Sequence, residues 1–101
     1  MFDLSGKVTF VTGASQGIGE VIAKYLARMG STVVCGSIPV TEQDLQRVVA
    51  DIQAEGGKAD HVLVDVSSGE SVKAAVNAVV ERHGGLHVLV NNAGITKDKL
   101  L

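Results

Sequence analysis

The stretch that most constrains this chain is a run of β-branched and aromatic residues, Val8-Thr-Phe-Val-Thr12, followed directly by Gly13-Ala-Ser-Gln-Gly17-Ile-Gly19. The run is typical of a buried parallel strand. Apolar residues at helical spacing then begin inside the glycine turn, at Ile18, Ile22, Leu26 and Met29. A strand, a glycine turn and a helix in this order can bind phosphate, because backbone N–H groups and the positive end of the helix dipole converge there.

The glycines are spaced G-x-x-x-G-x-G, which differs from the G-x-G-x-x-G of the standard dinucleotide fingerprint. Such a pattern is also compatible with a tight strand-to-helix turn that binds no ligand. The strand before the turn and the helix after it favour the phosphate-binding interpretation, since a Cβ in the turn would keep a phosphate away from the backbone.

Strand and helix patterns continue to alternate along the chain. We expect further strands at 32–36, 59–64 and 86–90 after a first strand at 7–12. We expect a first helix at 17–29. A second helix should begin after a loop at 37–40, with Thr41 as its N-cap, and a third should begin at a capping box at 67–70. Each helix is followed by glycine, the usual helix stop: Gly30, Gly56-Gly57 and Gly84-Gly85. The sequence therefore predicts one α/β domain over 1–101, βαβαβαβ, with parallel strands and right-handed crossovers.

Composition narrows the functional classes. The chain is 46% hydrophobic and 20% charged with a net charge of −2, which is typical of a globular domain without a basic nucleic-acid surface. No apolar run is long enough to cross a membrane, and residues 1–7 lack a signal-peptide pattern. We therefore expect a cytoplasmic location, with the mitochondrial matrix as the alternative. The three histidines match no metal motif, and Cys35 is expected to be a small core residue.

Two stretches together resemble a known family. Thr12-Gly-x-x-x-Gly17-x-Gly19 resembles the cofactor motif of the short-chain dehydrogenase/reductase family, and Asn91-Asn-Ala-Gly94 is similar to that family's Asn-Asn-Ala-Gly motif. The tail Ile95-Thr-Lys-Asp98 is similar to the Ile-Thr-Arg-Asp of the β-ketoacyl-acyl-carrier-protein reductase subgroup of fatty acid biosynthesis. The resemblance covers the whole chain but only the N-terminal part of the family's usual length. It implies a Rossmann-type sheet of order 3-2-1-4, with both motifs lining one crevice.

The resemblance also implies a set of residues that bind the dinucleotide. Thr12 would support the turn through its hydroxyl. The cofactor-binding residues would be Gly13, Ser15, Gln16, Gly17, Ile18, Gly19, Ser37, Asp65, Val66, Asn92, Ala93 and Gly94. Without the family, Asp65 reads as a solvated acid at a strand end, and residues 91–94 as an ordinary Asn/Gly turn.

The choice between NAD and NADP depends on the end of the second strand. NAD sites usually place an acid there to hold the ribose 2′-OH, but Gly36 and Ser37 occupy this place. NADP members of the family often carry Arg or Lys where this chain has Gln16. Without an acid or a base at these positions, the sequence favours NADP only slightly and leaves NAD open.

The family's catalytic Ser and Tyr-x-x-x-Lys lie downstream of the region that this chain matches, so no catalytic residue is expected here. The single tyrosine, Tyr25, is followed four residues later by Met29 and not by lysine. We expect the NAD(P)-binding part of an oxidoreductase, inactive alone. The alternatives are a non-catalytic nucleotide-binding or assembly module, or an incomplete protein without a function of its own. A strand at 86–90 without its next neighbour would expose an apolar edge, which predicts self-association.

Overall fold

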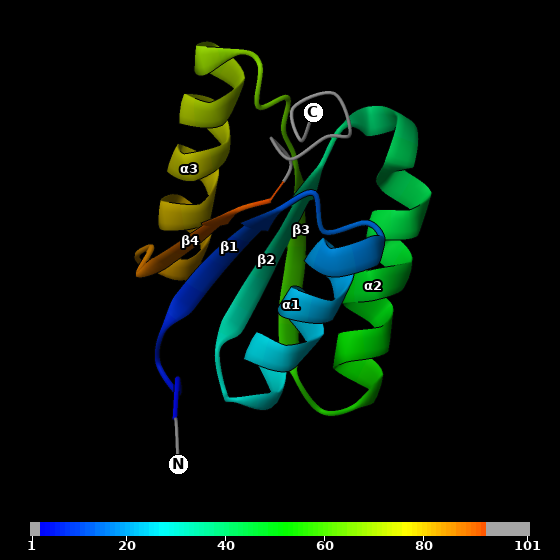
Figure 1. Cartoon of the computed structure of the whole chain (residues 1–101). Helices are drawn as coiled ribbons and strands as arrows, with labels where there is room; N and C mark the ends of the chain where they lie inside the picture. Colours follow the sequence, from blue (N-terminus) through cyan, green and yellow to red (C-terminus); the bar gives the residue numbers. More distant parts are fainter. Residues whose placement is uncertain (1–2, 93–101) are drawn as a thin grey trace.

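The strands pair into one parallel sheet, as the alternating pattern predicts. The computed structural model describes residues 3–92. Its elements in chain order are β1 (Val8–Thr12), α1 (Gly17–Arg28), β2 (Thr32–Ser37), the 3₁₀ turn η1 (Pro39–Thr41), α2 (Glu42–Ala54), β3 (Lys58–Leu63), α3 (Gly69–His83) and β4 (Val88–Asn91). The sheet order is β3-β2-β1-β4, so the expected order 3-2-1-4 is confirmed (Figure 1).

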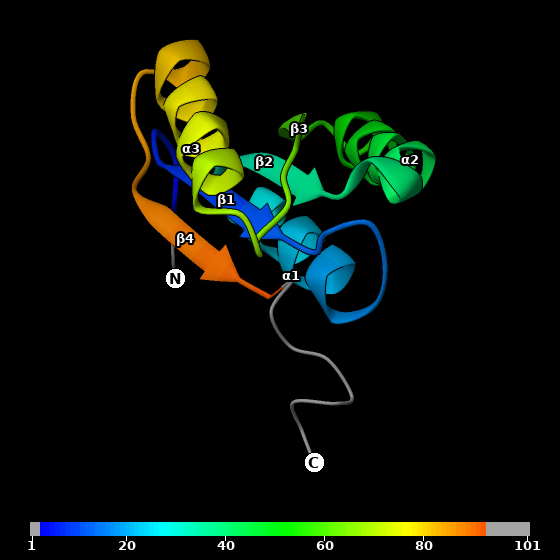
Figure 2. The ribbon, with the colours of Figure 1, turned by 90° about the horizontal axis from the view of Figure 1, so that it is seen from above.

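The helices form two layers around the sheet. Figure 2 shows α3 on one face and α1 with α2 on the other. Each face has its own core: one packs strand residues such as Val11 and Val33 against α1 and α2, and the other packs Phe10 and Val34 against α3. Because β1 and β2 are covered on both faces, their residues are almost all buried, which explains their continuous apolar sequence.

On the α3 face of the sheet, a large residue of β1 packs beside a glycine of the neighbouring strand β2. The Phe10 side chain of β1 is 1% exposed, and a Cβ built on Gly36 of β2 would lie 2.6 Å from the Phe10 ring atom Cε1. Glycine at 36 therefore leaves the space that the aromatic ring occupies. This is a packing role, distinct from the helix-ending role of glycines such as Gly30 and Gly84.

The helix stops are confirmed. Gly30, Gly56 and Gly84 follow the three helices and have φ values of +101°, +88° and +81°, in the left-handed region that favours glycine. Cys35 is fully buried as expected, and its burial, with a smaller contribution from Asp60, raises the pKa of the thiol to about 12.

The apolar pattern predicted for α1 is confirmed in part. Ile22 and Leu26 of the predicted apolar pattern pack against the core as partly buried residues, whereas Ile18 is 69% exposed, and Val21 and Tyr25 are also exposed. The fully buried residues of α1 are the small ones, Gly19, Ala23 and Ala27, and a Cβ on Gly19 would clash with the Gly13 carbonyl group.

Two helix starts also differ from the prediction. Thr41 precedes α2 as expected, but its side chain does not cap the helix, and the preceding loop contains η1. At α3 the cap is Ser68, whose Oγ accepts a 3.2 Å bond from the Ser71 N–H, in place of a capping box at 67–70. The Ser71 hydroxyl accepts a 2.8 Å bond from the Asp65 N–H, which ties the end of the β3 segment to α3.

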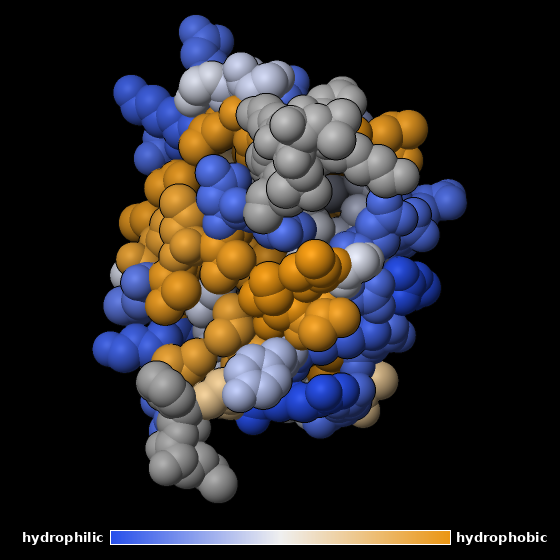
Figure 3. Space-filling view, viewed as in Figure 1, coloured by the Kyte–Doolittle hydropathy of each residue, from blue (hydrophilic) through white to orange (hydrophobic). Residues whose placement is uncertain are grey.

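One flank of the layered structure is open. Among residues 3–92, β4 pairs only with β1, so it is an edge strand, and it begins at Val88, two residues later than expected. We call the exposed apolar residues on the two sides of this edge the β4 flank: Ile18, Val21 and Tyr25 of α1 on one face of the sheet, and Leu89 of β4 on the α3 face. Figure 3 shows apolar side chains gathered on this side of the molecule. None of the helices in the described part of the chain is long and apolar enough to span a bilayer.

Candidate functional site

The turn between β1 and α1 has a backbone that glycine makes possible. Gly13 and Gly17 have φ values of +65° and +61°. Gly19 packs directly under the turn, since a Cβ there would lie 2.0 Å from the Gly13 carbonyl oxygen. Gln16 precedes α1, and its side chain does not cap the helix. The N–H groups of the first helical turn therefore receive no hydrogen bond from this side chain, and they form the positive end of the helix dipole beside the glycine turn. This is the local geometry of an anion-binding site.

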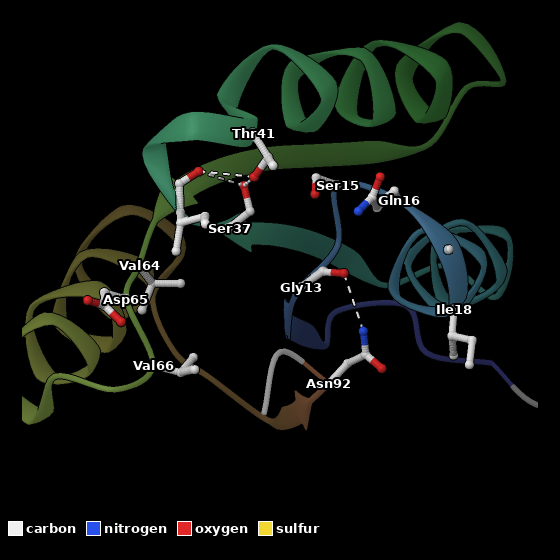
Figure 4. A pocket seen from close by; sticks show the side chains of 12 residues that line it. Gly13, Ser15, Gln16, Ile18, Ser37, Thr41, Val64, Asp65, Val66 and Asn92 are labelled. Atoms are coloured by element: carbon white, nitrogen blue, oxygen red, sulfur yellow. Dashed lines mark hydrogen bonds between the residues drawn. The ribbon is translucent and has the colours of Figure 1, made fainter. Parts of the chain in front are cut away.

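This turn forms one wall of a pocket of about 440 Å³ at the carboxyl ends of the strands (Figure 4). The register pairs Thr12 of β1 with Gly36 of β2 and with Asn91 of β4, so these three strands end at the same edge. The lining residues are Gly13, Ser15, Gln16, Gly17, Ile18, Ser37, Ile38, Thr41, Val64, Asp65, Val66 and Asn92. Open parallel sheets bind ligands at such an edge, where the strand order reverses.

Residues after β4 connect directly to the glycine turn. The Asn92 side-chain amide Nδ2 donates a 3.3 Å hydrogen bond to the Gly13 carbonyl oxygen. The Thr12 hydroxyl donates to the Asn91 Oδ1 at 3.1 Å and to the Val90 carbonyl at 3.4 Å, which joins β1 to β4 just below the pocket. The two motifs that the sequence singled out, far apart along the chain, are thus in contact.

The β2 side of the pocket carries hydroxyls. The Thr41 Oγ1 lies 2.9 Å from the Ser37 Oγ and 3.1 Å from the Ile38 carbonyl oxygen. The nearest acid in sequence, Glu42, is not a lining residue, because its Oε2 lies 3.6 Å from the His61 Nε2 at β3. This end of the described pocket is therefore polar and uncharged.

The third wall is the segment after β3. Val64 is buried there, and Asp65 is exposed. The Asp65 carboxylate accepts hydrogen bonds from the Ser67 hydroxyl at 2.6 Å and the Ser67 N–H at 3.0 Å, which hold the pKa of Asp65 below its usual range. Asp65 is the only charged residue among the lining residues that the structure describes.

The structure brings most of the expected site residues to one pocket. Gly19 is the exception, because it lies beneath the turn as a packing contact and does not line the pocket. Ala93 and Gly94 lie outside the described residues. Three lining residues were not predicted from the sequence: Ile38, Thr41 and Val64. Val64 had a signal, since it ends an expected strand next to Asp65, but Ile38 and Thr41 depend on the η1 turn, which no motif marked.

In described residues 3–92, no group of three His, Cys, Asp or Glu side chains could hold a metal ion. The lining residues offer hydrogen bonds from backbone N–H groups, hydroxyls and an amide, one carboxylate at Asp65, and apolar walls. This combination suits a phosphorylated ligand that has a flat apolar part.

Comparisons with known proteins agree with this geometry. Residues 7–101 match the short chain dehydrogenase family. The 3-oxoacyl-[acyl-carrier-protein] reductase FabG of Thermotoga maritima is 40% identical over 98 residues, which are 97% of this chain and 39% of that protein. The corresponding Vibrio cholerae protein is 40% identical over 99 residues, 98% of this chain and 38% of its own length. The chain thus spans about two-fifths of the curated relatives it matches.

Solved structures show the same arrangement. A metagenomic short-chain oxidoreductase in complex with NADP superposes with a TM-score of 0.84 at 42% identity, covering 91% of this chain and 41% of that one. A dehydrogenase/reductase from Sinorhizobium meliloti 1021 superposes with a TM-score of 0.88 at 42% identity, covering 92% and 36%. The chain therefore belongs to the short-chain dehydrogenase/reductase family of oxidoreductases.

Proposed function

We propose that this chain is a dinucleotide-binding domain that holds NADP, or less favourably NAD, in the pocket at the carboxyl ends of β1, β2 and β4. The observation that carries the proposal is the glycine turn, which a Cβ at Gly19 would push apart and which Asn92 holds from the other side. These residues fit a dinucleotide, because a close approach of backbone N–H groups to a pyrophosphate requires such a turn.

Each part of the pocket has a role in this proposal. The turn from Gly13 to Ile18 binds the pyrophosphate, and Ser37 receives the ribose 2′ group of the adenosine. Asp65 and Val66 lie beside the adenine. Asn92 contacts the adenine-ribose side of the cofactor, and the resemblance extends this role to Ala93 and Gly94, which lie outside the described residues. Gly19 acts indirectly, by letting α1 start directly under the turn.

Three observations support NADP over NAD. A metagenomic relative and a Burkholderia cenocepacia relative, both 42% identical, were solved in complex with NADP. The β2 end of the described pocket carries no carboxylate that would repel a 2′-phosphate. Glu42, which could have supplied one, lies beside His61 instead.

We also propose that the activity to which this chain contributes is that of a 3-oxoacyl-[acyl-carrier-protein] reductase, the name that the relatives carry. The bound nicotinamide would supply the hydride in that reaction, and the residues of this chain would position it. The chain has one tyrosine, Tyr25, which is exposed on α1. We therefore propose that the 101-residue chain binds the cofactor without reducing a substrate. The alternative, a non-catalytic nucleotide-binding module, would also bind the cofactor without reducing a substrate.

Self-association through β4 is part of the same proposal. An edge strand presents unpaired backbone groups that recruit another strand. Leu89 on this edge is 54% exposed, and the rest of the β4 flank is apolar as well. A second copy could cover both the backbone edge and this surface.

Isothermal calorimetry with NADP⁺ tests the site. Gly19→Val should abolish binding, because the added side chain overlaps the Gly13 carbonyl. Its matched control is Gly69→Ala at the start of α3, where a Cβ meets nothing within 4 Å and binding should not change.

A second pair of variants avoids any clash. Ile18→Asp places a negative charge on an exposed lining position near the proposed pyrophosphate, and an acid in the first turn of α1 does not disfavour the helix. We expect at least about tenfold weaker binding from charge repulsion. Val21→Asp, equally exposed but outside the pocket lining, is the control. Equal affinities for the two aspartate variants would refute the site.

A further inference from the structure

Thr41 is a pocket residue that neither the glycine motif nor the Asn-Asn-Ala-Gly motif points to. It stands at the N-cap position of α2, where a threonine hydroxyl normally accepts a hydrogen bond from the helix. Its hydroxyl instead lies 2.9 Å from the Ser37 Oγ and 3.1 Å from the Ile38 carbonyl oxygen. The Thr41 hydroxyl thus contacts the end of β2 instead of capping α2.

This contact determines what the Ser37 hydroxyl can do. When the Thr41 hydroxyl donates to the Ser37 Oγ, the Ser37 proton must point elsewhere. Its acceptor in the structure is the Ile38 carbonyl at 3.3 Å, which is long for an O–H···O bond. A stronger acceptor in the pocket can therefore take this proton at little cost. A phosphate oxygen is such an acceptor, since bonds from a hydroxyl to a charged oxygen are shorter and stronger than neutral ones.

The acids nearest to Ser37 have other partners, so they do not compete with a phosphate for its hydroxyl. Ser37 is 5% exposed and sits at the pocket wall, so its hydroxyl has a defined position. The two nearest acids are engaged elsewhere: Glu42 lies beside His61, and Asp65 accepts two bonds from Ser67. Figure 4 shows Ser37 and Thr41 together on one side of the pocket, with Asp65 apart from them.

We propose that Thr41 is a positioning residue for cofactor choice, which holds the Ser37 hydroxyl so that it donates to the 2′-phosphate of a bound adenine dinucleotide. This inference rests on the proposed function, because it places the 2′ group on the β2 side of the same pocket. Thr41 acts through Ser37, so its removal affects a ligand that has a 2′-phosphate far more than one that has a 2′-hydroxyl.

The test compares NADP⁺ with NAD⁺, two ligands that differ only in the 2′-phosphate, by calorimetry on the full 101-residue chain. Thr41→Val keeps the shape of the side chain and removes the hydroxyl. We expect NADP⁺ affinity to fall by about five- to tenfold, in the range of one hydrogen bond to a charged group, with NAD⁺ affinity changed by less than about twofold. Thr41→Ser should restore the preference. Thr32→Val, at the opposite end of β2, is the matched control.

A double variant tests whether the two hydroxyls act as one unit. If Thr41 works only by orienting Ser37, then Ser37→Ala combined with Thr41→Val should bind NADP⁺ no more weakly than Ser37→Ala alone. Fully additive losses would overturn the positioning role.

The remaining outcomes are also distinct. An equal loss for NADP⁺ and NAD⁺ in Thr41→Val would show that Thr41 only shapes the turn into α2, and no loss for either would show that it is a bystander. Both results overturn this inference and leave the proposed function in place. If the unaltered chain binds neither dinucleotide, the proposed function fails, and this inference fails with it.

Discussion

The side-chain amide of Asn92 donates a hydrogen bond to the Gly13 carbonyl oxygen across 3.3 Å, joining the end of β4 to the turn after β1. A Cβ on Gly19 would lie 2.8 Å from the same Asn92 Nδ2. Turn, helix start and amide therefore form one packed unit. Any change that moves Asn92 also changes the backbone that lines the pocket.

Asn92→Asp should weaken dinucleotide binding. The substitution keeps the size of the side chain but replaces the donor with a carboxylate, which would face the Gly13 carbonyl oxygen as a second acceptor. We expect about tenfold weaker binding of both NADP⁺ and NAD⁺, from the lost bond and the added charge beside the pocket. Asn77→Asp, at an exposed position of α3, should leave affinity unchanged. Equal calorimetric affinities for the two variants would show that the amide does not support the site.

Ser37→Asp should shift the preference toward NAD. A carboxylate at the end of β2 can accept a hydrogen bond from the ribose 2′-OH and repels a 2′-phosphate. We expect the ratio of NAD⁺ to NADP⁺ affinity to rise by at least about tenfold. Ser37→Asn has a similar size without the charge and separates the electrostatic effect from crowding. An unchanged ratio would mean that the 2′ group does not lie beside Ser37.

Leu89→Lys should reduce self-association. Leu89 is 54% exposed on the edge strand, and a charged side chain there opposes pairing with another strand. Sedimentation velocity over a range of concentrations should show larger species for the unaltered chain and a shift toward monomer for the variant. Val40→Lys, at an 83% exposed apolar position in η1, is the control. A monomeric unaltered chain at high concentration would contradict the proposed edge contact.

Asp60→Asn should lower stability in a pH-dependent way. Burial by itself raises the pKa of the Asp60 carboxyl, but hydrogen bonds from His83 at 3.0 Å, the His61 N–H at 2.7 Å and Arg82 at 3.3 Å outweigh it, so the pKa lies below its usual range. A carboxyl with a lowered folded-state pKa stabilises the fold at pH values above its unfolded pKa. This contribution is lost as the pH falls through the folded pKa.

We therefore expect Asp60→Asn to reduce the free energy of unfolding by about 0.5–1 kcal/mol near pH 7, the size of a partly exposed ion pair. The difference should shrink as the pH falls below the usual pKa of an aspartate. Urea denaturation followed by circular dichroism at several pH values measures it. Glu81→Gln, an exposed neighbour on α3 without an ion pair to the described residues, should show little effect. A constant difference at all pH values would exclude the charge as the cause.

The chain alone should not oxidise NADPH with an acetoacetyl thioester. Reduction of a ketone needs a proton donor placed beside the carbonyl as well as the hydride. Tyr25, the only tyrosine, is 59% exposed on α1 and is not a lining residue of the pocket. Turnover above the background of a reductase-free preparation, lost in Tyr25→Phe, would require a catalytic site that differs from the family's.

The sheet and its order could be predicted from the sequence because strands, glycine stops and motifs all indicated the same fold. Which residues of α1 are fully buried could not be predicted. In α1 the large residues from Ile18 to Leu26 and the small residues from Gly19 to Ala27 repeat at the same helical period, one position apart. Periodicity shows that a helix has faces but does not show which of two adjacent rows is fully buried. Here it is the row of small residues, with Ile22 and Leu26 partly buried beside it.

The lining residues of the pocket likewise divide into those that the sequence predicts and those that it does not. Residues tied to a motif, such as Gly13 and Asn92, were placed in the pocket by strand order alone. Thr41 was missed because its pattern marks it as a helix cap, and its actual partner depends on a single 3₁₀ turn. Local hydroxyl contacts of this kind have several nearly equal choices along a sequence, and only the folded backbone selects among them.

The fit of Phe10 against Gly36 has a consequence for how this fold can diverge. The Phe10 ring fills the volume that a side chain at 36 would need. Substitutions that make residue 10 smaller and residue 36 larger can therefore occur only in that order. A smaller residue at 10 must come first and leaves a temporary void, after which a larger residue at 36 can refill it. The reverse path passes through a clash at the centre of the sheet. With phenylalanine at 10 and Val64 beside it, this backbone leaves no room for a side chain at 36, whether or not a ligand is bound.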